Sequence, residues 1–160
     1  MLNERHSPLR TERTGRKDKP NPGAKAHAFT EYNSGMSVKV VNLAEKFGAF
    51  SEYFSPKIAG DLNDSHIKLG KVKGDFIWHH HENEDELFLV VKGVLKMKIR
   101  EDGKEREFEI HPGELIVIPK GMEHLPSSDE ETHLMMIEPK TTLNTGNVRN
   151  ERTKEKLDSI

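Results

Sequence analysis

The chain has 160 residues, of which 33% are hydrophobic and 32% charged, and its formal net charge is −2. This length can bury the core of one ordinary domain, although the small apolar fraction indicates that part of the chain does not pack. The sequence has no apolar run long enough to span a membrane, and it has no cysteine, which excludes disulfides and thiolate zinc sites. We therefore expect a cytoplasmic protein with neither a membrane nor a nucleic acid as partner, because the overall charge is nearly neutral.

The first 36 residues differ in composition from the rest of the chain. They carry seven Lys or Arg against four Asp or Glu, together with several prolines and glycines. Because they show almost no apolar periodicity, residues 1–36 are predicted to be a disordered basic leader. A tail that binds nucleic acid is the alternative interpretation. The segment from Met36 is more typical of a domain start, so either Met1 or Met36 is expected to be the natural N-terminus.

Short strand-like segments dominate residues 37–140, which are predicted to form one domain. Asn42 is expected to cap a short helix over Leu43–Phe47, which Gly48 ends. The strand-like segments that follow are separated by turn-forming residues. They are Lys57–Leu62, His66–Val72, Phe76–His81, Glu86–Val91, Val94–Arg100, Glu105–His111, Glu114–Ile118 and Thr132–Ile137. Many short strands with frequent turns predict an all-β sandwich or barrel.

One hairpin can be predicted in register, because Asp102-Gly103 is a strong signal for a two-residue turn. Centring the hairpin there gives an apolar face and a face of opposite charges. The pairs are Arg100 with Glu105, Lys98 with Glu107, Lys96 with Glu109, Leu95 with Ile110 and Met97 with Phe108. A slip by one residue would bury the charges, so the register is well determined.

The last segment, residues 141–160, is predicted to be a polar C-terminal tail. Asn150 could cap a short helix over Glu151–Asp158, in which Glu comes early and Lys later, as the helix dipole favours. The only apolar anchors of this helix are Leu157 and Ile160. We therefore expect it at the edge of the domain.

The run from Trp78 to His81, which contains three consecutive histidines, carries the strongest functional signal. Side chains alternate along a strand, so His79 and His81 are expected on one face and His80 on the other. The returning strand opens with Glu86. Two imidazoles and a carboxylate on adjacent strands form the core of a metal site. His124, which follows a turn after a buried strand, is the best candidate for a fourth ligand.

Other polar residues near this run are weighed against the four candidates. Glu84 is kept as an alternative oxygen donor, while Glu82 and Asp85 are interpreted as a solvated turn. His133 and Glu138 could reach the mouth of a barrel, but their spacing selects neither. The face formed by Trp78, Leu87, Leu89 and Val91 is too apolar for water, so either N-terminal strands or a second subunit should cover it. We expect a homodimer.

The spacing of these residues resembles the two motifs of the cupins. The first motif, Gly-x5-His-x-His-x3–4-Glu-x6-Gly, is similar to the pattern of Gly74, His79, His81, Glu86 and Gly93, with one residue missing after the first glycine. The second, Gly-x5-Pro-x-Gly-x2-His, matches Gly113, Pro119, Gly121 and His124, but Ser128 stands where the motif ends in Asn. The chain also resembles small bacterial cupins labelled mannose-6-phosphate-isomerase-like, a group with no established reaction.

This resemblance implies a double-stranded β-helix, or jelly roll, with a metal ion inside the barrel. It implies His79, His81, Glu86 and His124 as the ligands of one divalent transition metal ion, which could be Fe, Mn, Ni, Zn or Cu. The donor chemistry alone gives the same range, because imidazoles with one carboxylate suit borderline divalent ions and not calcium. Neither the metal nor a catalytic residue is identified.

Three functions are compatible with such a site. The first, which we favour, is a metal-dependent enzyme of the oxygenase type that acts on a small polar molecule. The second is an isomerase or epimerase of sugars or sugar phosphates, which needs a base and phosphate-binding cations such as Lys68, Lys71, Lys73 or Lys120. The third is a non-catalytic module that binds a small molecule. Fold alone does not decide between them.

Overall fold

The computed structural model describes residues 38–160. The predicted leader over residues 1–36 and the choice between Met1 and Met36 lie outside this range. Within it, no helix has the length and apolar character that crossing a membrane requires. The described elements are α1 (Leu43–Gly48), β1 (Lys57–Leu62), β2 (Ser65–Asp75), β3 (Glu86–Lys92), β4 (Leu95–Glu101), β5 (Lys104–Ile110), β6 (Leu115–Ile118) and β7 (His124–Pro139). As predicted, the Asn42 side chain caps α1 by accepting from the Glu45 N–H.

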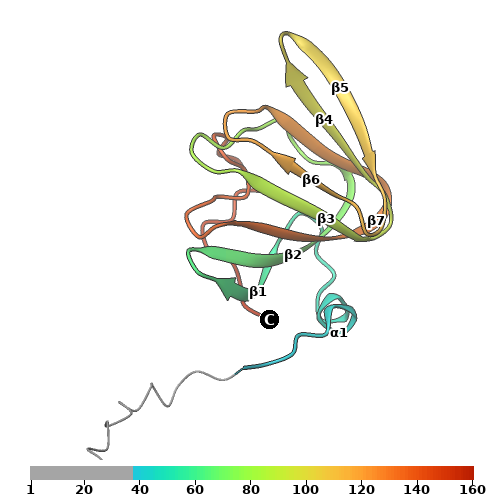
Figure 1. Ribbon diagram of the computed structural model, residues 1–160, viewed down its shortest axis with the longest axis vertical. Coiled ribbons are helices and arrows are strands. Elements are labelled where there is room, and N and C mark those ends of the chain that lie inside the picture. The colour runs from blue at the N-terminus through green and yellow to red at the C-terminus, as the bar shows by residue number, and fades with distance from the viewer. Residues whose placement is uncertain (1–37) are drawn as a thin grey trace, which may run out of the picture. The chain divides into compact units, whose positions relative to one another are not determined.

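The strands form an antiparallel sheet in which β7 is shared by two parts (Figure 1). One part has the strand order β1-β2-β7-β3-β6, and the other consists of the β4–β5 hairpin. The first residues of β7, from His124 to Ser127, pair with β4. Its later residues, from Thr132 onward, lie between β2 and β3. This arrangement confirms the predicted all-β jelly roll.

The β4–β5 hairpin has the predicted register, including the pairs Arg100 with Glu105 and Leu95 with Ile110. Asp102 and Gly103 both have positive φ, as a tight hairpin turn of this type requires. The ion pair from Arg100 to Glu105 measures 3.1 Å, and the Lys98–Glu107 pair measures 3.8 Å. Lys96 also pairs with Glu109 in the ladder, as predicted, but its side chain bonds to Asp129 of β7, at 2.6 Å, instead of forming an ion pair with Glu109.

The inner faces of the strands enclose the main hydrophobic core. Alternate residues of β3, β4 and β7 point into it, as the period of two along a strand dictates. The buried core residues are Val72, Phe88, Val90, Leu95, Met97, Ile99, Ile110, Ile118, Leu134 and Met136. A smaller cluster, Phe47, Phe50 and Leu69, packs on the opposite side of the sheet, where α1 covers it.

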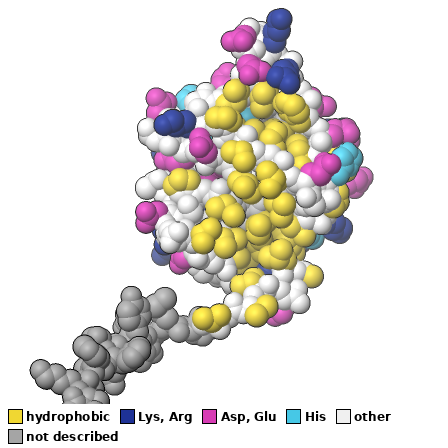
Figure 2. Space-filling model, viewed as in Figure 1, with side chains coloured by type: hydrophobic (Ala, Val, Ile, Leu, Met, Phe, Trp, Pro, Cys, Tyr) yellow, Lys and Arg dark blue, Asp and Glu magenta, His cyan; other side chains and the backbone are white. Residues whose placement is uncertain are grey.

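Beyond α1 the opposite side of the sheet remains apolar. Paired residues of neighbouring strands place hydrophobic side chains next to one another, and Figure 2 shows them as a continuous band. We call these residues the outer apolar face: Ile67, Leu87, Leu89, Leu115, Val117, Met135 and Ile137. Leu115 is 55% exposed and Val117 is 48% exposed. Trp78 was expected on this side. Its ring lies instead under the Arg100 guanidinium, whose central carbon is 3.9 Å from the ring centre.

The predicted strand over Phe76–His81 was wrong. This segment forms a single bridge, from His79 to His124, and its next backbone groups bond elsewhere. The His80 N–H donates to the Asn147 side chain, and the His81 carbonyl accepts from Gly121. The predicted alternation nevertheless holds, because His79 and His81 are buried whereas His80 is partly exposed.

The predicted C-terminal helix was also wrong, since residues 151–158 form turns and no helix. The Asn144 side chain donates to the Arg152 carbonyl and accepts from the Lys154 N–H, at 2.9 and 2.8 Å. These bonds engage backbone groups that a helix would use. The segment then joins the sheet edge, where the Ile160 N–H donates to the Ile58 carbonyl. Residues 141–160 therefore pack against the barrel.

Gly93, which follows β3, tests how closely the chain packs against Thr132 of β7. Its φ is +82°, and an added Cβ would collide with the Thr132 hydroxyl and lie 2.9 Å from the Thr132 Cα. Gly103 has a similar φ of +72° but open space around it. We expect Gly103→Ala to cost about 1 kcal/mol of unfolding free energy, from backbone conformation alone. Gly93→Ala should cost at least about 2 kcal/mol more. Urea unfolding would measure both, and equal losses would contradict the packing argument.

Candidate metal centre

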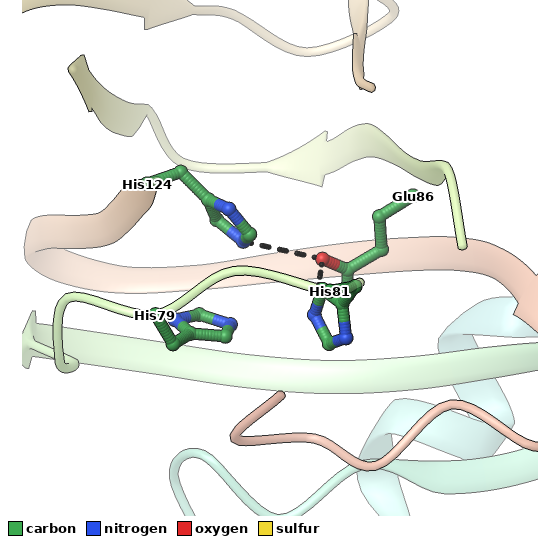
Figure 3. A group of neighbouring side chains, drawn as sticks. All are labelled: His79, His81, Glu86 and His124. Carbon is green, nitrogen blue, oxygen red and sulfur yellow. Dashed lines mark ion pairs between the residues drawn. The ribbon is translucent and has the colours of Figure 1, made fainter. Parts of the chain in front are cut away.

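Four polar side chains converge inside the barrel (Figure 3). They are the four predicted from the sequence: His79, His81, Glu86 and His124. Each offers one ligand atom, and these atoms all lie within 4.8 Å of one another. All four residues are buried, with at most 4% of any of them exposed. We call this group the four-residue cluster.

Backbone pairing explains why residues distant in sequence meet here. His79 and His124 form a two-way bridge, with N–H to carbonyl distances of 3.1 and 2.9 Å. His124 is the first residue of β7 and Glu86 the first residue of β3. The start of β7 pairs with β4 and its far end with β3, so the folding of the barrel, and not one ladder, brings His124 to Glu86 beside the loop that carries His79 and His81.

Two of the imidazoles are oriented by backbone carbonyls. Nδ1 of His79 lies 2.9 Å from the Ile77 carbonyl, and Nδ1 of His124 lies 3.0 Å from the Met122 carbonyl. Each contact requires a proton on Nδ1 and leaves the lone pair of Nε2 free, which is the arrangement typical of histidine ligands. The rings are held in this orientation by the chain itself.

Three further polar atoms of the cluster are buried without a hydrogen bond. Nε2 of His81 and Nε2 of His124 lie 3.1 and 3.2 Å from the same Glu86 oxygen, Oε2. None of these three buried atoms makes a well-formed hydrogen bond. Unsatisfied buried polar groups are rare and need an explanation. A cation at their common point would satisfy all of them, and the donor set of three imidazoles and one carboxylate fits a borderline divalent ion.

The protonation states also suit a cation. Burial lowers the pKa of His79 to about 4, and the neighbouring His124 acts in the same direction. At neutral pH His79 is therefore uncharged, which is the form that binds metals. Burial acts to raise the pKa of Glu86, but His124 and His81 outweigh it and hold that pKa below its usual range. Glu86 therefore remains ionised.

A cavity of about 50 Å³ lies beside the cluster. His79 and Glu86 form part of its wall, so the cluster faces the cavity directly. Most of the other lining residues are apolar: Phe54, Val72, Phe76, Phe88, Leu134 and Met136. This volume holds a few water molecules.

Glu138 adds a second carboxyl to the cavity wall. It is 2% exposed, and its Oε1 lies 2.7 Å from Nζ of Lys68, which is 1% exposed. Burial raises the pKa of Glu138 to about 8, and the nearby Glu86 acts in the same direction. The sequence left Glu138 unselected. Glu138 shares one face of β7 with Leu134 and Met136, because the three residues are two positions apart. This pattern is informative only after β7 has been identified as a strand.

The other candidates lie outside the cluster. The side chain of Glu84, the alternative oxygen donor, accepts a hydrogen bond from Thr141 instead, at 3.2 Å. Nε2 of His80 lies 3.4 Å from the Glu82 carboxylate. His133 lies on the opposite side of the sheet and stacks on Phe47, with ring centres 4.3 Å apart.

The C-terminal segment contributes residues that the sequence did not reveal. The Asn147 side chain accepts from the His80 N–H, and the Asn147 N–H donates to the His80 carbonyl, both at 3.0 Å. Any side chain at Gly146, whose φ is +51°, would collide with that carbonyl. Residues 146–147 therefore hold the loop that positions His79 and His81. The Gly-Asn pair indicates a turn, but nothing local identifies its partner.

Comparisons with known proteins agree with this geometry. Residues 67–138 match the cupin domain family (Cupin_2). The uncharacterized protein YdbB of Bacillus subtilis is 33% identical over 81 residues, which are 50% of this chain and 68% of that protein. The 3-hydroxyanthranilate 3,4-dioxygenase of Xenopus tropicalis is 32% identical over 98 residues. These are 58% of this chain, but only 34% of the dioxygenase.

A solved structure matches over nearly its whole length. A cupin-2 domain protein from Shewanella frigidimarina is 40% identical, with a TM-score of 0.60, over 63% of this chain and 95% of that one. The shared part thus includes almost the entire solved domain. Because sequence and fold agree over that length, the chain belongs to the cupin family.

Proposed function

We propose that the protein is a metal-dependent enzyme of the oxygenase type, acting on a small molecule. His79, His81, Glu86 and His124 hold one divalent transition metal ion. The observation that carries the proposal is the set of buried donor atoms without hydrogen bonds, directed at one point beside a cavity. When bound, the ion supplies a Lewis acid and, if it is iron, a centre for dioxygen chemistry.

The residues of the chain orient the ligands and exclude water. The carbonyls of Ile77 and Met122 hold two imidazoles with Nε2 free. The apolar cavity wall limits water around the site, which strengthens electrostatic interactions with a bound substrate. The similarity to a dioxygenase supports this class of reaction, although the chain spans about a third of that relative.

The sugar-phosphate isomerase alternative has less support from the cavity. Such a substrate needs unpaired cations for its phosphate. Lys68 is already paired with Glu138, and Lys73 pairs with Glu130 at 3.5 Å. A non-catalytic binding protein would use the same cavity and remains an outcome of the assays below. The cytoplasmic location stays a prediction.

We also propose that the outer apolar face joins two copies of the chain. The seven residues of this face occupy four adjacent strands, and one of them, Met135, packs against the cluster around Phe47 that α1 covers. Two of the seven are about half exposed, on the edge strand β6. A contiguous apolar patch of this kind is typical of an interface between subunits.

His81→Ala should abolish metal retention, because it removes one of four ligands and leaves Nε2 of His124 and the Glu86 carboxylate with an incomplete site. His80→Ala is the matched control, since His80 points away from the cluster. Metal content after purification without added metal, with circular dichroism to check folding, would measure both. Full occupancy in folded His81→Ala would refute the ligand assignment.

Oxygen uptake should appear when the iron-loaded protein is mixed with a substrate from a panel of aromatic diols, aminophenols and β-diketones. Removal of the metal with a chelator should abolish it, and Glu86→Gln should lower it by at least about tenfold. An oxygen electrode would record the rates. Bound zinc alone, with no uptake on any compound, would count against the oxygenase class.

Light scattering on the eluting peak of a sizing column should give twice the mass of one chain. Val117→Asp should shift the protein to the monomer, because burying a carboxylate in an apolar interface is costly. Lys104→Asp, at the exposed start of β5, is the control and should leave the mass unchanged. A monomeric wild-type protein would exclude this interface.

A further inference from the structure

A groove of about 440 Å³ adjoins the cavity and lies between residues 52–57 and residues 151–158. Phe54 and Pro56 line both the groove and the cavity, so residues 54–56 form the wall between the two. The cavity, at about 50 Å³, holds only a few water molecules. A substrate larger than that needs further space beside the four-residue cluster, and the groove can supply it.

Phe54 has an unusual backbone conformation in this wall. Its φ of +54° lies in the left-handed region, which bulky residues rarely adopt. Such strain is frequent in ligand clamps and switch regions. The Phe54 ring stacks on Phe76, with ring centres 5.0 Å apart, and the Phe76 ring meets the His79 ring edge-on at 5.3 Å. Displacement of the Phe54 ring would therefore open a path from the groove towards His79.

Arg152 covers Phe54 on the side of the groove. The central carbon of its guanidinium lies 5.3 Å from the centre of the Phe54 ring, and its Nη1 donates to the Asp75 carbonyl at 2.9 Å. The Arg152 backbone is held more firmly. Its N–H donates to the Asn150 side chain and its carbonyl accepts from the Asn144 side chain, both at 2.9 Å. The chain thus fixes the position of Arg152 and leaves its side chain able to change partners.

The groove carries a small excess of positive charge. Its charged lining residues are four basic and three acidic: Lys57, Arg152, Lys154, Lys156, Glu52, Glu151 and Asp158. Lys57 is already neutralised by two of the carboxylates, at 3.4 and 2.9 Å. Within the described residues, by contrast, the Arg152 guanidinium contacts a carbonyl and two aromatic rings and no carboxylate. A guanidinium binds a carboxylate through two parallel hydrogen bonds, more strongly than it binds an exposed ring. The single excess charge suits a monoanion.

We propose that the substrate is a small carboxylic acid, whose carboxylate binds Arg152 in the groove while its other end passes Phe54 into the cavity. The carboxylate draws the guanidinium away from Phe54, so that binding favours displacement of the ring. Arg152 is then a specificity-determining residue. That the inner end of the acid meets a metal ion rests on the proposed function, whereas the carboxylate site on Arg152 does not.

Propionate and propionamide are suitable probes, because they have nearly the same shape and only propionate is charged. Titration of the zinc-loaded protein, followed by its amide NMR signals, would give both dissociation constants. We expect propionate to bind at least about tenfold more tightly, as hydrogen bonds between charged groups allow. Equal affinities would overturn the proposal. Tighter binding of methyl phosphate than of propionate would refute the substrate class.

Arg152→Met removes the charge and keeps an unbranched side chain over Phe54. Its preference for propionate should fall by about tenfold. Arg106→Met is the matched control, because Arg106 also lies over an aromatic ring, 5.0 Å from the centre of Phe108, but not in the groove. This variant should keep the preference. A preference retained in folded Arg152→Met would mean that the metal or the lysines bind the carboxylate, and would overturn the proposal.

Phe54→Ala tests the passage through the wall. The variant should bind propionate at least about threefold more tightly, because the protein no longer has to displace the ring before binding. Unchanged or weaker binding by the folded variant would contradict the passage.

A crystal of the wild-type protein soaked with propionate gives a result that does not depend on a variant folding. A carboxylate on Arg152 with its methyl group in the cavity supports the proposal. A carboxylate elsewhere, or a propionate that remains wholly in the groove, overturns it. The two proposals fail differently, since a protein that retains no metal but prefers propionate through Arg152 would refute the metal centre alone.

Discussion

The pairing of β7 with three other strands is the constraint on which the interior depends. Its first residues form a ladder with β4, and its later residues lie between β2 and β3. The strand begins at His124 and has Glu138 near its end, so it carries both a residue of the cluster and the second carboxyl. A slip of one residue would turn Ile137 inward and Glu138 outward. Such a slip would leave the buried Lys68 ammonium group without Glu138, so this ion pair opposes it.

The buried polar groups impose the second constraint. Glu86 and Glu138 lie close enough in a dry interior for each charge to disfavour the other, and Lys68 offsets only one of them. Because uncompensated charges in such surroundings are costly, the barrel needs either a further proton or a further cation. The imidazoles around Glu86 provide a place for that cation. The cluster is thus explained better as a binding site than as a stabilising network.

Features determined by neighbouring residues could be predicted from the sequence. The β4–β5 register follows from Asp102-Gly103 and from the charge alternation, both of which act over a few residues. His79 and His81 were placed correctly because alternation applies to extended backbone even where no regular strand forms. Ser128, which replaces the Asn of the motif, bonds to the Val94 carbonyl and the Thr132 hydroxyl, at 2.9 and 2.7 Å. Its role is thus visible only in the folded chain.

Features determined by distant partners could not be predicted. The polar start of β7, with Pro126 inside it, has little strand propensity, and its ladder with β4 overrides that tendency. The predicted C-terminal helix does not form, because its backbone groups bond to the Asn144 side chain and to the edge of β1 instead. Glu138 could be recognised only after the extent of β7 was known. In each case a contact across the barrel outweighs the local preference.

The cavity and the outer apolar face lie on opposite sides of the same strands. Met135 and Ile137 point outward between the inward residues Leu134, Met136 and Glu138, so one backbone serves both surfaces. Local opening is easiest where a sheet has few buried contacts, and Leu115 and Val117 of the edge strand β6 are both about half exposed. A partner on the outer face would add contacts to β6 and, through the ladder, hold Glu86 opposite Ile118. Association would thereby keep the first residue of β3, and its carboxylate, in position for a cation.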